Sequence, residues 1–304
     1  MDSILDIGAP MSAAFLERCL ARLRQRYPFL YCRELSRTRC GRPLCAVQLG
    51  GGAVKVMITA AHHANESITA LLLLRFLEQF CRAVCRDERL DGISARKLFQ
   101  TSMLYCVPLA NPDGAELVSG ALAESSPEYR AAKEIAGQFP GIAFPDGWKA
   151  NLSGVDLNLN FPADWELAKK IKAAQGFDRP APRDYPGKAP LDQPETAALC
   201  AWCGCIRPDR LVCLHTQGEV IYPANEPISG SAVLAERMQS VSGYAVQTAP
   251  PQSANAGFKD WFCARFRRPG FTVEAGLGTN PLPLSDLSSI YPAVRAILLQ
   301  TLRP

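Results

Sequence analysis

The chain has 304 residues, of which 48% are hydrophobic, and 33 basic and 29 acidic residues give a net charge of +4. This length and apolar content suit one large α/β domain, and the charges form no basic block, so nucleic acid is not expected as a partner. The most apolar run, residues 68–77, contains Arg75 and is too short to span a membrane. The first residues lack the pattern of a secretory signal, and twelve scattered cysteines favour buried thiols in a reducing compartment. We therefore expect a cytoplasmic location.

The first part of the chain alternates predicted strands and helices. Strands are expected at residues 29–35, 44–49, 54–60 and 103–108. Apolar residues at helical spacing predict an amphipathic helix over 10–26 and a strongly apolar helix from about 67 to 85. The last of these strands ends at Asn111-Pro112-Asp113-Gly114, whose composition is typical of a turn.

The second part begins with a looser pattern. Gly, Pro and Ser are frequent over residues 119–147, and five prolines between 176 and 194 predict a surface loop. Further strands are predicted at 210–214 and 271–274. Helices are predicted at 195–205, 232–242, 258–265 and 284–302. This alternation predicts a mixed or parallel sheet covered on both faces, in one domain over residues 1–304 that includes the helix and hairpin of residues 1–50.

All three histidines of the chain, His62, His63 and His215, lie just past predicted strands. In α/β proteins these strand ends carry the functional sites. A catalytic zinc ion takes two or three imidazoles or carboxylates and keeps one position open. His63 and Glu66, with two residues between them at the start of a helix, can face one ion, and His215 fits as a ligand from a distant strand. His62 is also spaced to pair with Glu66 on a helix, so this spacing allows either neighbouring histidine as the ligand.

Four cysteines could also suggest a structural zinc ion, because their spacing is compact: Cys200, Cys203, Cys205 and Cys213. The first three fall on a predicted helix, where Cys200 and Cys203 share a face that Cys205 does not. The pattern therefore disfavours a structural zinc site. The Gly50-Gly51-Gly52 run lies between two strands and lacks the pattern of a phosphate-binding loop, so it is expected to be a hairpin turn.

Several motifs taken together resemble the zinc carboxypeptidase superfamily. They occur in order between residues 55 and 283: His63-x-x-Glu66, Asn111-Pro112-Asp113-Gly114, Gly154-Val155-Asp156-Leu157-Asn158-x-Asn160-Phe161, His215 with Gly218-Glu219, and Thr272-Val273-Glu274. Four further segments are similar to the bacterial γ-D-glutamyl-L-diamino-acid endopeptidases, which cut stem peptides of the cell wall: Trp148-Lys149-Ala150-Asn151, Asn160-Phe161-Pro162-Ala163, Pro182-Arg183-Asp184-Tyr185-Pro186-Gly187 and Gly278-Thr279-Asn280-Pro281-Leu282-Pro283.

The resemblance implies a fold and a site. It implies a twisted mixed sheet of eight strands between helices, with one zinc ion at the C-terminal edge of the sheet. It assigns the ligands to His63 rather than His62, with Glu66 and His215, and it matches Glu274 to the family's general base. Glu274 also ends a buried strand, where a carboxylate without a task or partner would be costly.

The mechanism implied by the resemblance is hydrolysis of a peptide bond. Glu274 would take a proton from the attacking water and pass it to the leaving amine. The negative charge that develops on the carbonyl oxygen needs a nearby cation. In the carboxypeptidases an arginine follows the tryptophan at the position of Trp148, and Lys149 stands there in this chain. We therefore predict Lys149 as the oxyanion donor, with a solvated loop lysine as the alternative.

A second departure from the superfamily concerns the substrate. Carboxypeptidases that trim C-termini carry Asn-Arg-Asn, whose arginine grips the terminal carboxylate, and this chain has Leu159 at that place. A γ-D-glutamyl–diamino acid stem peptide is therefore favoured over the C-terminus of a protein. Asn158 is predicted to contact the substrate, and Arg183 to supply a replacement cation. Tyr244 precedes Glu274 by thirty residues, as a mobile active-site tyrosine would, although a core or surface position is favoured for it.

Two other functions are compatible with these motifs. One is a zinc amidohydrolase that removes an acyl group from a small amino acid, and the proline-rich segment around Arg183 favours a peptide over such a substrate. The other is a non-catalytic binder of peptidoglycan fragments. The complete set of His63, Glu66, His215 and Glu274 argues against the binder, because loss of function usually removes one of these residues. The sequence therefore favours a zinc peptidase with a muropeptide as its substrate.

Overall fold

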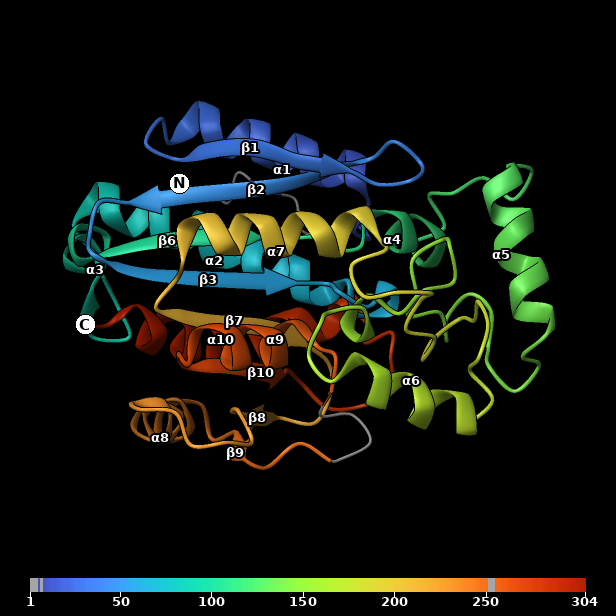
Figure 1. Cartoon of the computed structure of the whole chain (residues 1–304). Helices are drawn as coiled ribbons and strands as arrows, with labels where there is room; N and C mark the ends of the chain where they lie inside the picture. Colours follow the sequence, from blue (N-terminus) through green and yellow to red (C-terminus); the bar gives the residue numbers. More distant parts are fainter. Residues whose placement is uncertain (1–4, 6–7, 251–254) are drawn as a thin grey trace.

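The computed structural model describes residues 5, 8–250 and 255–304, so most of the N-terminal segment used above to argue against a secretory signal lies outside it. The protein is built around a mixed sheet of eight strands in the order β1-β2-β6-β3-β7-β10-β8-β9 (Figure 1). The strands are β1 (Tyr31–Arg37), β2 (Pro43–Gly50), β3 (Val54–Ala60), β6 (Ser102–Val107), β7 (Arg210–His215), β8 (Val220–Tyr222), β9 (Ala245–Val246) and β10 (Gly270–Glu274). A separate pair consists of β4 (Arg89–Leu90) and β5 (Ile93–Ser94). The eight-stranded mixed sheet implied by the resemblance is confirmed.

The four central strands run parallel and end at one edge. β3 pairs with β6 and β7, and β7 pairs with β10, all in parallel register. Helices bury both faces of the sheet at these strands. For this reason β3 and β7 are nearly continuous hydrophobic runs. Within the register of β7 and β10, His215 lies opposite Glu274. The sheet therefore brings together residues that are far apart in the sequence.

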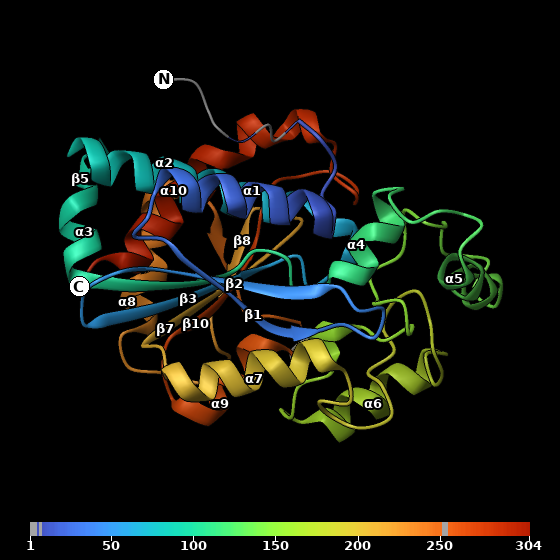
Figure 2. The ribbon, with the colours of Figure 1, turned by 90° about the horizontal axis from the view of Figure 1, so that it is seen from above.

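Helices cover both faces of the sheet (Figure 2). They are α1 (Ala13–Arg26), α2 (Ile68–Arg86), α3 (Ala95–Thr101), α4 (Pro112–Val118), α5 (Pro127–Gly137), α6 (Trp165–Ala174), α7 (Pro194–Ile206), α8 (Ser231–Ser242), α9 (Phe258–Phe266) and α10 (Leu287–Leu302). α1, α2 and α10 share one hydrophobic core with the sheet, and α7 and α9 form a second core on the opposite face. α5 and α6 lie beyond the edge where the parallel strands end (Figure 1).

The predicted turn at residues 111–114 is instead the start of helix α4. Asn111 caps this helix, because its Oδ1 accepts a hydrogen bond from the backbone N–H of Gly114 at 2.9 Å, and Pro112 occupies the first helical position. A Cβ atom on Gly114 would lie only 2.5 Å from the carbonyl oxygen of Ala150. Pro112 is thus favoured by the helix start, and Gly114 is required by the close backbone contact. Both residue types are also common in turns.

The stretch from 119 to 194 is more ordered than its composition indicated. α5 and α6 form within it, and α6 carries an apolar face with Trp165 and Ala168 buried. Residues 175–193 lack a helix or strand, as expected, yet Ala181, Tyr185 and Gly187 are buried. The reason is that backbone N–H groups of Lys149 and Ala150 both donate to the carbonyl of Pro182, at 2.8 and 2.9 Å. This segment is therefore a loop whose middle, residues 181–187, packs against the protein, while residues 178–180 and 188–190 are exposed as predicted.

None of the described helices is long and apolar enough to cross a membrane. All twelve cysteines lie in the described residues and are free thiols. Cys200, Cys203 and Cys213 belong to the core between the sheet and α7, whereas Cys205 is exposed. The four therefore do not converge on a structural metal site, in agreement with the helical spacing.

Candidate active site

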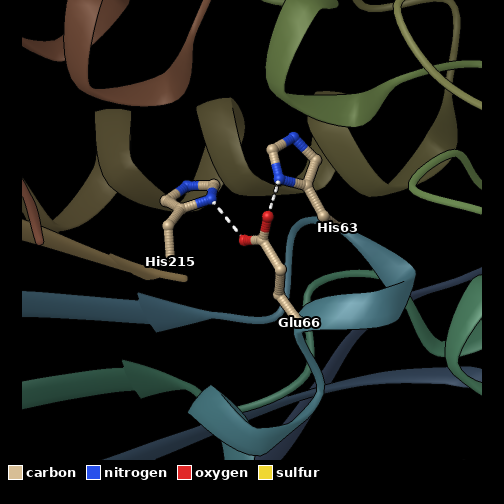
Figure 3. Close-up of side chains that lie close together, drawn as sticks. All are labelled: His63, Glu66 and His215. Carbon is tan, nitrogen blue, oxygen red and sulfur yellow. Dashed lines mark hydrogen bonds and ion pairs between the residues drawn. The ribbon is translucent and has the colours of Figure 1, made fainter. Parts of the chain in front are cut away.

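Three side chains converge at the edge where the parallel strands end (Figure 3). His63 follows β3, Glu66 ends the short 3-10 helix Ala64–Glu66, and His215 is the last residue of β7. The His63 Nδ1 atom lies 2.8 Å from Glu66 Oε1, and the His215 Nδ1 atom lies 2.9 Å from Glu66 Oε2. The possible ligand atoms of the three residues lie within 4.8 Å of one another. The structure thus brings together the three predicted metal ligands.

These residues fit a zinc ion by their chemistry. Two imidazoles and one carboxylate are a common ligand set of catalytic zinc sites, and they leave a position open. Asp156 lies behind His63, with its Oδ1 3.3 Å from His63 Nε2. Such a carboxylate accepts the second N–H of a ligand histidine and so fixes the tautomer that presents the other nitrogen to the metal. His63 would therefore bind through Nδ1, the atom that faces Glu66.

The charges of this cluster support one another despite burial. Burial lowers the pKa of His63, but the nearby Glu66 and Asp156 charges outweigh it and raise that pKa to about 9. Burial alone would raise the pKa of each carboxyl, yet the charges of His63 and Lys149 hold the pKa values of Glu66 and Asp156 well below their usual range. Both carboxylates are therefore ionised at neutral pH, as cation binding requires.

His62 is directed away from the ligand cluster. Its Nε2 lies 2.8 Å from Thr59 Oγ1, and its ring stacks on His215 with 5.5 Å between ring centroids. The side chain is fully buried, and burial lowers its pKa well below the usual value, so the ring is neutral. His62 therefore supports His215 from behind, and the choice that spacing left open falls on His63, as the resemblance implied.

A pocket of about 580 Å³ opens beside the three ligands and includes Glu274 in its lining. Glu274 is the last residue of β10, opposite His215 in the strand register. Burial raises the pKa of this carboxyl above its usual value. Glu274 thus lies next to the candidate zinc site without being one of its three ligands, as a general base requires.

Lys149 also lines the pocket, with Nζ 2.8 Å from Glu66 Oε1. Burial lowers the pKa of Lys149, but the Glu66 carboxylate outweighs it and raises the pKa above its usual value, so the amine is charged. Asn111 holds this segment, because its Nδ2 donates to the backbone carbonyls of His62, Lys149 and Ala150 at 3.2, 3.3 and 3.0 Å. Lys149 is therefore a fixed cation of the site and not a solvated loop lysine, and its action on the oxyanion stays a prediction.

The other predicted substrate contacts divide into two groups. Asn158 and Arg183 line the pocket, where Asn158 Oδ1 accepts from the backbone N–H of Phe258 at 3.2 Å and Arg183 Nε donates to Asp184 Oδ2 at 2.6 Å. Tyr244 does not line it: the side chain is 2% exposed in the main core, and its hydroxyl accepts from the backbone N–H of Gly276 at 3.2 Å. A substrate contact by Tyr244 is therefore wrong, and the favoured core position is the one that the structure shows, because this tyrosine packs under the loop that follows β10.

Sequence reasoning gave no role to three residues that shape the site. Asp156 belongs to the motif at residues 154–161, but only the fold shows that it faces His63. Thr216 and Asn280 bond to each other, with Thr216 Oγ1 donating to Asn280 Oδ1 at 2.7 Å, and the Thr216 backbone N–H lies 3.3 Å from Glu66 Oε2. Asn280 belongs to one of the segments that carried the endopeptidase resemblance, which was the available signal for it.

Replacing Asp156 with asparagine is expected to weaken zinc binding by about 10–100-fold, because the amide carries no charge to polarise and orient His63. The measurement is competition for zinc against a chelator of known affinity. Asp178→Asn is the matched control, because Asp178 is exposed and pairs only with Arg179 among the described residues. An unchanged zinc affinity in Asp156→Asn would exclude a positioning role for this carboxylate.

Comparisons with known proteins agree with this geometry. A family model described as zinc carboxypeptidase matches residues 16–289. Gamma-D-glutamyl-L-diamino acid endopeptidase 1 of Lysinibacillus sphaericus is 39% identical over 286 residues, which cover 92% of this chain and 69% of that protein. Protein YqgT of Bacillus subtilis is 38% identical, covering 94% of this chain and 76% of that one.

Solved structures show the same fold at lower identity. Bovine thrombin-activatable fibrinolysis inhibitor has a TM-score of 0.71 and 15% identity, covering 97% of both chains. Murein-tripeptide amidase MpaA from Escherichia coli has a TM-score of 0.55 and 22% identity, covering 88% of this chain and 91% of that one. The family match, the sheet topology and the assembled histidine–glutamate–histidine cluster lead to one conclusion: this chain belongs to the zinc carboxypeptidase family of metallopeptidases.

Proposed function

We propose that this peptidase hydrolyses the γ-D-glutamyl–diamino acid bond of peptidoglycan stem peptides. The observation that carries the proposal is Leu159, which lies in the pocket lining where carboxypeptidases that trim C-termini hold an arginine. A leucine cannot form the charged pair by which that arginine grips a terminal carboxylate. The relative from Lysinibacillus sphaericus is named for the proposed bond, and its 39% identity adds support.

Cations elsewhere in the pocket suit a substrate whose carboxylates are placed differently. A stem peptide carries a free carboxylate on its D-glutamyl residue and others on the diamino acid. Arg183 lies in the wall of the pocket and its side chain is 42% exposed, so its guanidinium can reach a bound peptide. We assign to Arg183 one of these carboxylates, as a replacement for the missing arginine at position 159.

The residues of the pocket divide the chemical steps among them. A zinc ion held by His63, Glu66 and His215 supplies a Lewis acid and lowers the pKa of water. Glu274 accepts a proton as the water oxygen bonds to the amide carbon, and it delivers a proton to the nitrogen as the C–N bond breaks. Lys149 stabilises the negative charge on the carbonyl oxygen. Asn158, which lines the pocket, contacts the substrate.

The test is incubation of the zinc-loaded protein with L-Ala-γ-D-Glu-meso-diaminopimelate, with products identified by mass spectrometry. We expect L-Ala-D-Glu and free diaminopimelate. A matched peptide with an α-linked L-glutamate in place of the γ-linked D-glutamate is expected to be cleaved at least about tenfold more slowly in kcat/KM, a difference of more than 1.4 kcal/mol in transition-state binding. Cleavage of N-acyl amino acids with the stem peptide left intact would instead support the amidohydrolase function.

A further inference from the structure

Two oppositely charged neighbours, Lys259 and Asp260, lie in the lining of the active-site pocket. We propose that this pair binds the far end of the diamino acid, with Lys259 taking a carboxylate and Asp260 taking an ammonium group. The pocket would thereby select a side chain that ends in both charges, such as diaminopimelate, over lysine, which ends in an ammonium alone. This inference rests on the proposed function and specifies its substrate.

The ammonium of Lys259 is buried but not fully used. The residue is 4% exposed, and its Nζ lies 2.8 Å from Asp260 Oδ1 and donates to the carbonyl of Pro223 at 3.3 Å. An ammonium has three N–H donors, so these two partners in the described residues leave one donor for a ligand. The Asp260 side chain is 18% exposed, and its Oδ2 accepts from the backbone N–H of Gly257 at 3.2 Å. Both charges therefore hold fixed positions and reach the pocket.

The strand register places the pair below the reacting centre. The Lys259 stem lies against Gly270, where an added Cβ would meet its Cγ at 3.4 Å. Its ammonium reaches Pro223, the residue after Tyr222, which pairs with Thr272 in the sheet. Thr272 precedes Glu274 by two residues on the same face of β10, a separation of about 7 Å along the strand. These contacts put the ammonium near the level of Thr272, which lines the same pocket before the proposed base is reached along β10.

This placement suits the length of the proposed ligand. In a diaminopimelate residue the reacting amide nitrogen is on one α-carbon, and the second α-carbon is four C–C bonds away, about 5 Å in an extended chain. That second α-carbon carries both an ammonium and a carboxylate. A lysine side chain of similar length brings only an ammonium, which Asp260 can hold, but it brings no carboxylate for Lys259 and places a second positive charge near the Lys259 ammonium. The two ammonium groups would repel each other at this short distance, and this repulsion disfavours lysine relative to diaminopimelate.

The Asp260 carboxylate also caps the start of α9, but this structural role does not require a buried ammonium beside it. Burying an ion pair carries a desolvation cost that apolar residues of similar volume avoid, so such a pair contributes little to stability. The location also differs from that of an ordinary surface pair, because Lys259 lies at the start of α9 and faces the same pocket as Glu274. A charged pair with an unused donor in a substrate pocket is instead expected of a site that reads a charged ligand.

The test uses three peptides that share L-Ala-γ-D-Glu and differ in the next residue: meso-diaminopimelate with both end charges, L-lysine with the ammonium only, and L-2-aminopimelate with the carboxylate only. For the wild-type protein we expect kcat/KM on diaminopimelate to exceed both others by about 10–100-fold, as for loss of one charged hydrogen bond. Lys259→Met is expected to lower kcat/KM by about 10–100-fold on the diaminopimelate and aminopimelate peptides, mainly through a higher KM. It should keep or increase kcat/KM on the lysine peptide. Asp260→Asn is expected to lower kcat/KM by a similar factor on the diaminopimelate and lysine peptides and to leave the aminopimelate peptide unaffected.

Lys55→Met is the matched control, because Lys55 also donates to a backbone carbonyl, that of Ile206 at 3.2 Å, but lies outside the pocket lining. It should leave the substrate order unchanged, and thermal unfolding of each variant checks the fold. An equal loss on all three peptides in Lys259→Met, or a wild-type protein that cleaves all three equally, would overturn the inference while leaving the proposed function intact.

Calorimetric titration of the zinc-loaded protein with free meso-diaminopimelate and free L-lysine separates the two proposals, because it needs no cleavage. If no γ-D-glutamyl peptide is cleaved but diaminopimelate binds at least about tenfold more tightly than lysine and Lys259→Met abolishes that difference, the proposed function fails and the inference stands. If cleavage occurs without any dependence on Lys259, only the inference fails. Absence of both cleavage and selective binding rejects the two together.

Discussion

Glu274→Gln is expected to lower kcat on the stem peptide by about 10³-fold while the protein still binds one zinc ion. Glutamine has the shape of glutamate but cannot accept the proton of the attacking water. Zinc should be retained, because the three candidate ligands are His63, Glu66 and His215. The fold should also be retained, since the change removes a buried carboxyl whose pKa is already raised by burial.

The measurements are single-substrate kinetics on the diaminopimelate peptide, zinc content by atomic absorption, and thermal unfolding. Glu195→Gln is the matched control, because burial also raises the pKa of the Glu195 carboxyl, but Glu195 lies at the start of α7, outside the pocket lining. This control should keep wild-type kcat. A Glu274→Gln protein within tenfold of the wild-type kcat would show that another group accepts the proton, and Glu274 would lose its assignment as the base.

Glu66→Gln is expected to weaken zinc binding more strongly than Asp156→Asn does. The two carboxylate oxygens of Glu66 each face the Nδ1 atom of one ligand histidine, and Lys149 pairs with the same carboxylate. A neutral amide cannot provide this charge, and it presents an N–H to one of the two sides. Activity should therefore fall to background at zinc concentrations that saturate the wild-type protein.

The change in melting temperature on zinc addition provides the test, because a ligand that binds only the folded state stabilises it by mass action. We expect a zinc-dependent rise in Tm for the wild-type protein and for Glu195→Gln, and none for Glu66→Gln at the same zinc concentration. A wild-type rise in Tm for Glu66→Gln would mean that the metal is held by other residues, and the assignment of the His63, Glu66 and His215 cluster would be wrong.

The central sheet and the metal ligands could be predicted because their signals are local. Strands β3, β7 and β10 are mostly apolar, and each one ends at or just before a histidine or a glutamate that can bind a metal or accept a proton. Parallel strands then bring these ends together without further information. The choice between His62 and His63 was not local, since it depends on the backbone after Ala60 turning one ring toward Glu66 and the other toward Thr59.

Other features depend on contacts that spacing does not encode. Asp156 meets His63, and Lys259 reaches Pro223, only because separate segments fold over the same strand ends. Helix α4 was read as a turn because Asn, Pro and Gly favour both a turn and a capped helix start. The distance of Tyr244 from Glu274 along the chain is compatible with an active-site tyrosine, but this distance does not show which face of the sheet the residue packs on.

Asn111 has a consequence for how the pocket can open. Its amide nitrogen reaches the carbonyls of His62, Lys149 and Ala150, and its Oδ1 caps α4. One buried side chain thus ties the loop before the ligands, the segment of the proposed oxyanion donor and a helix end into a single cooperative unit, which local fluctuations can open only as a whole. Substrate entry must therefore leave this side of the pocket in place, together with the segment around Arg183, because the backbone N–H groups of Lys149 and Ala150 hold the carbonyl of Pro182.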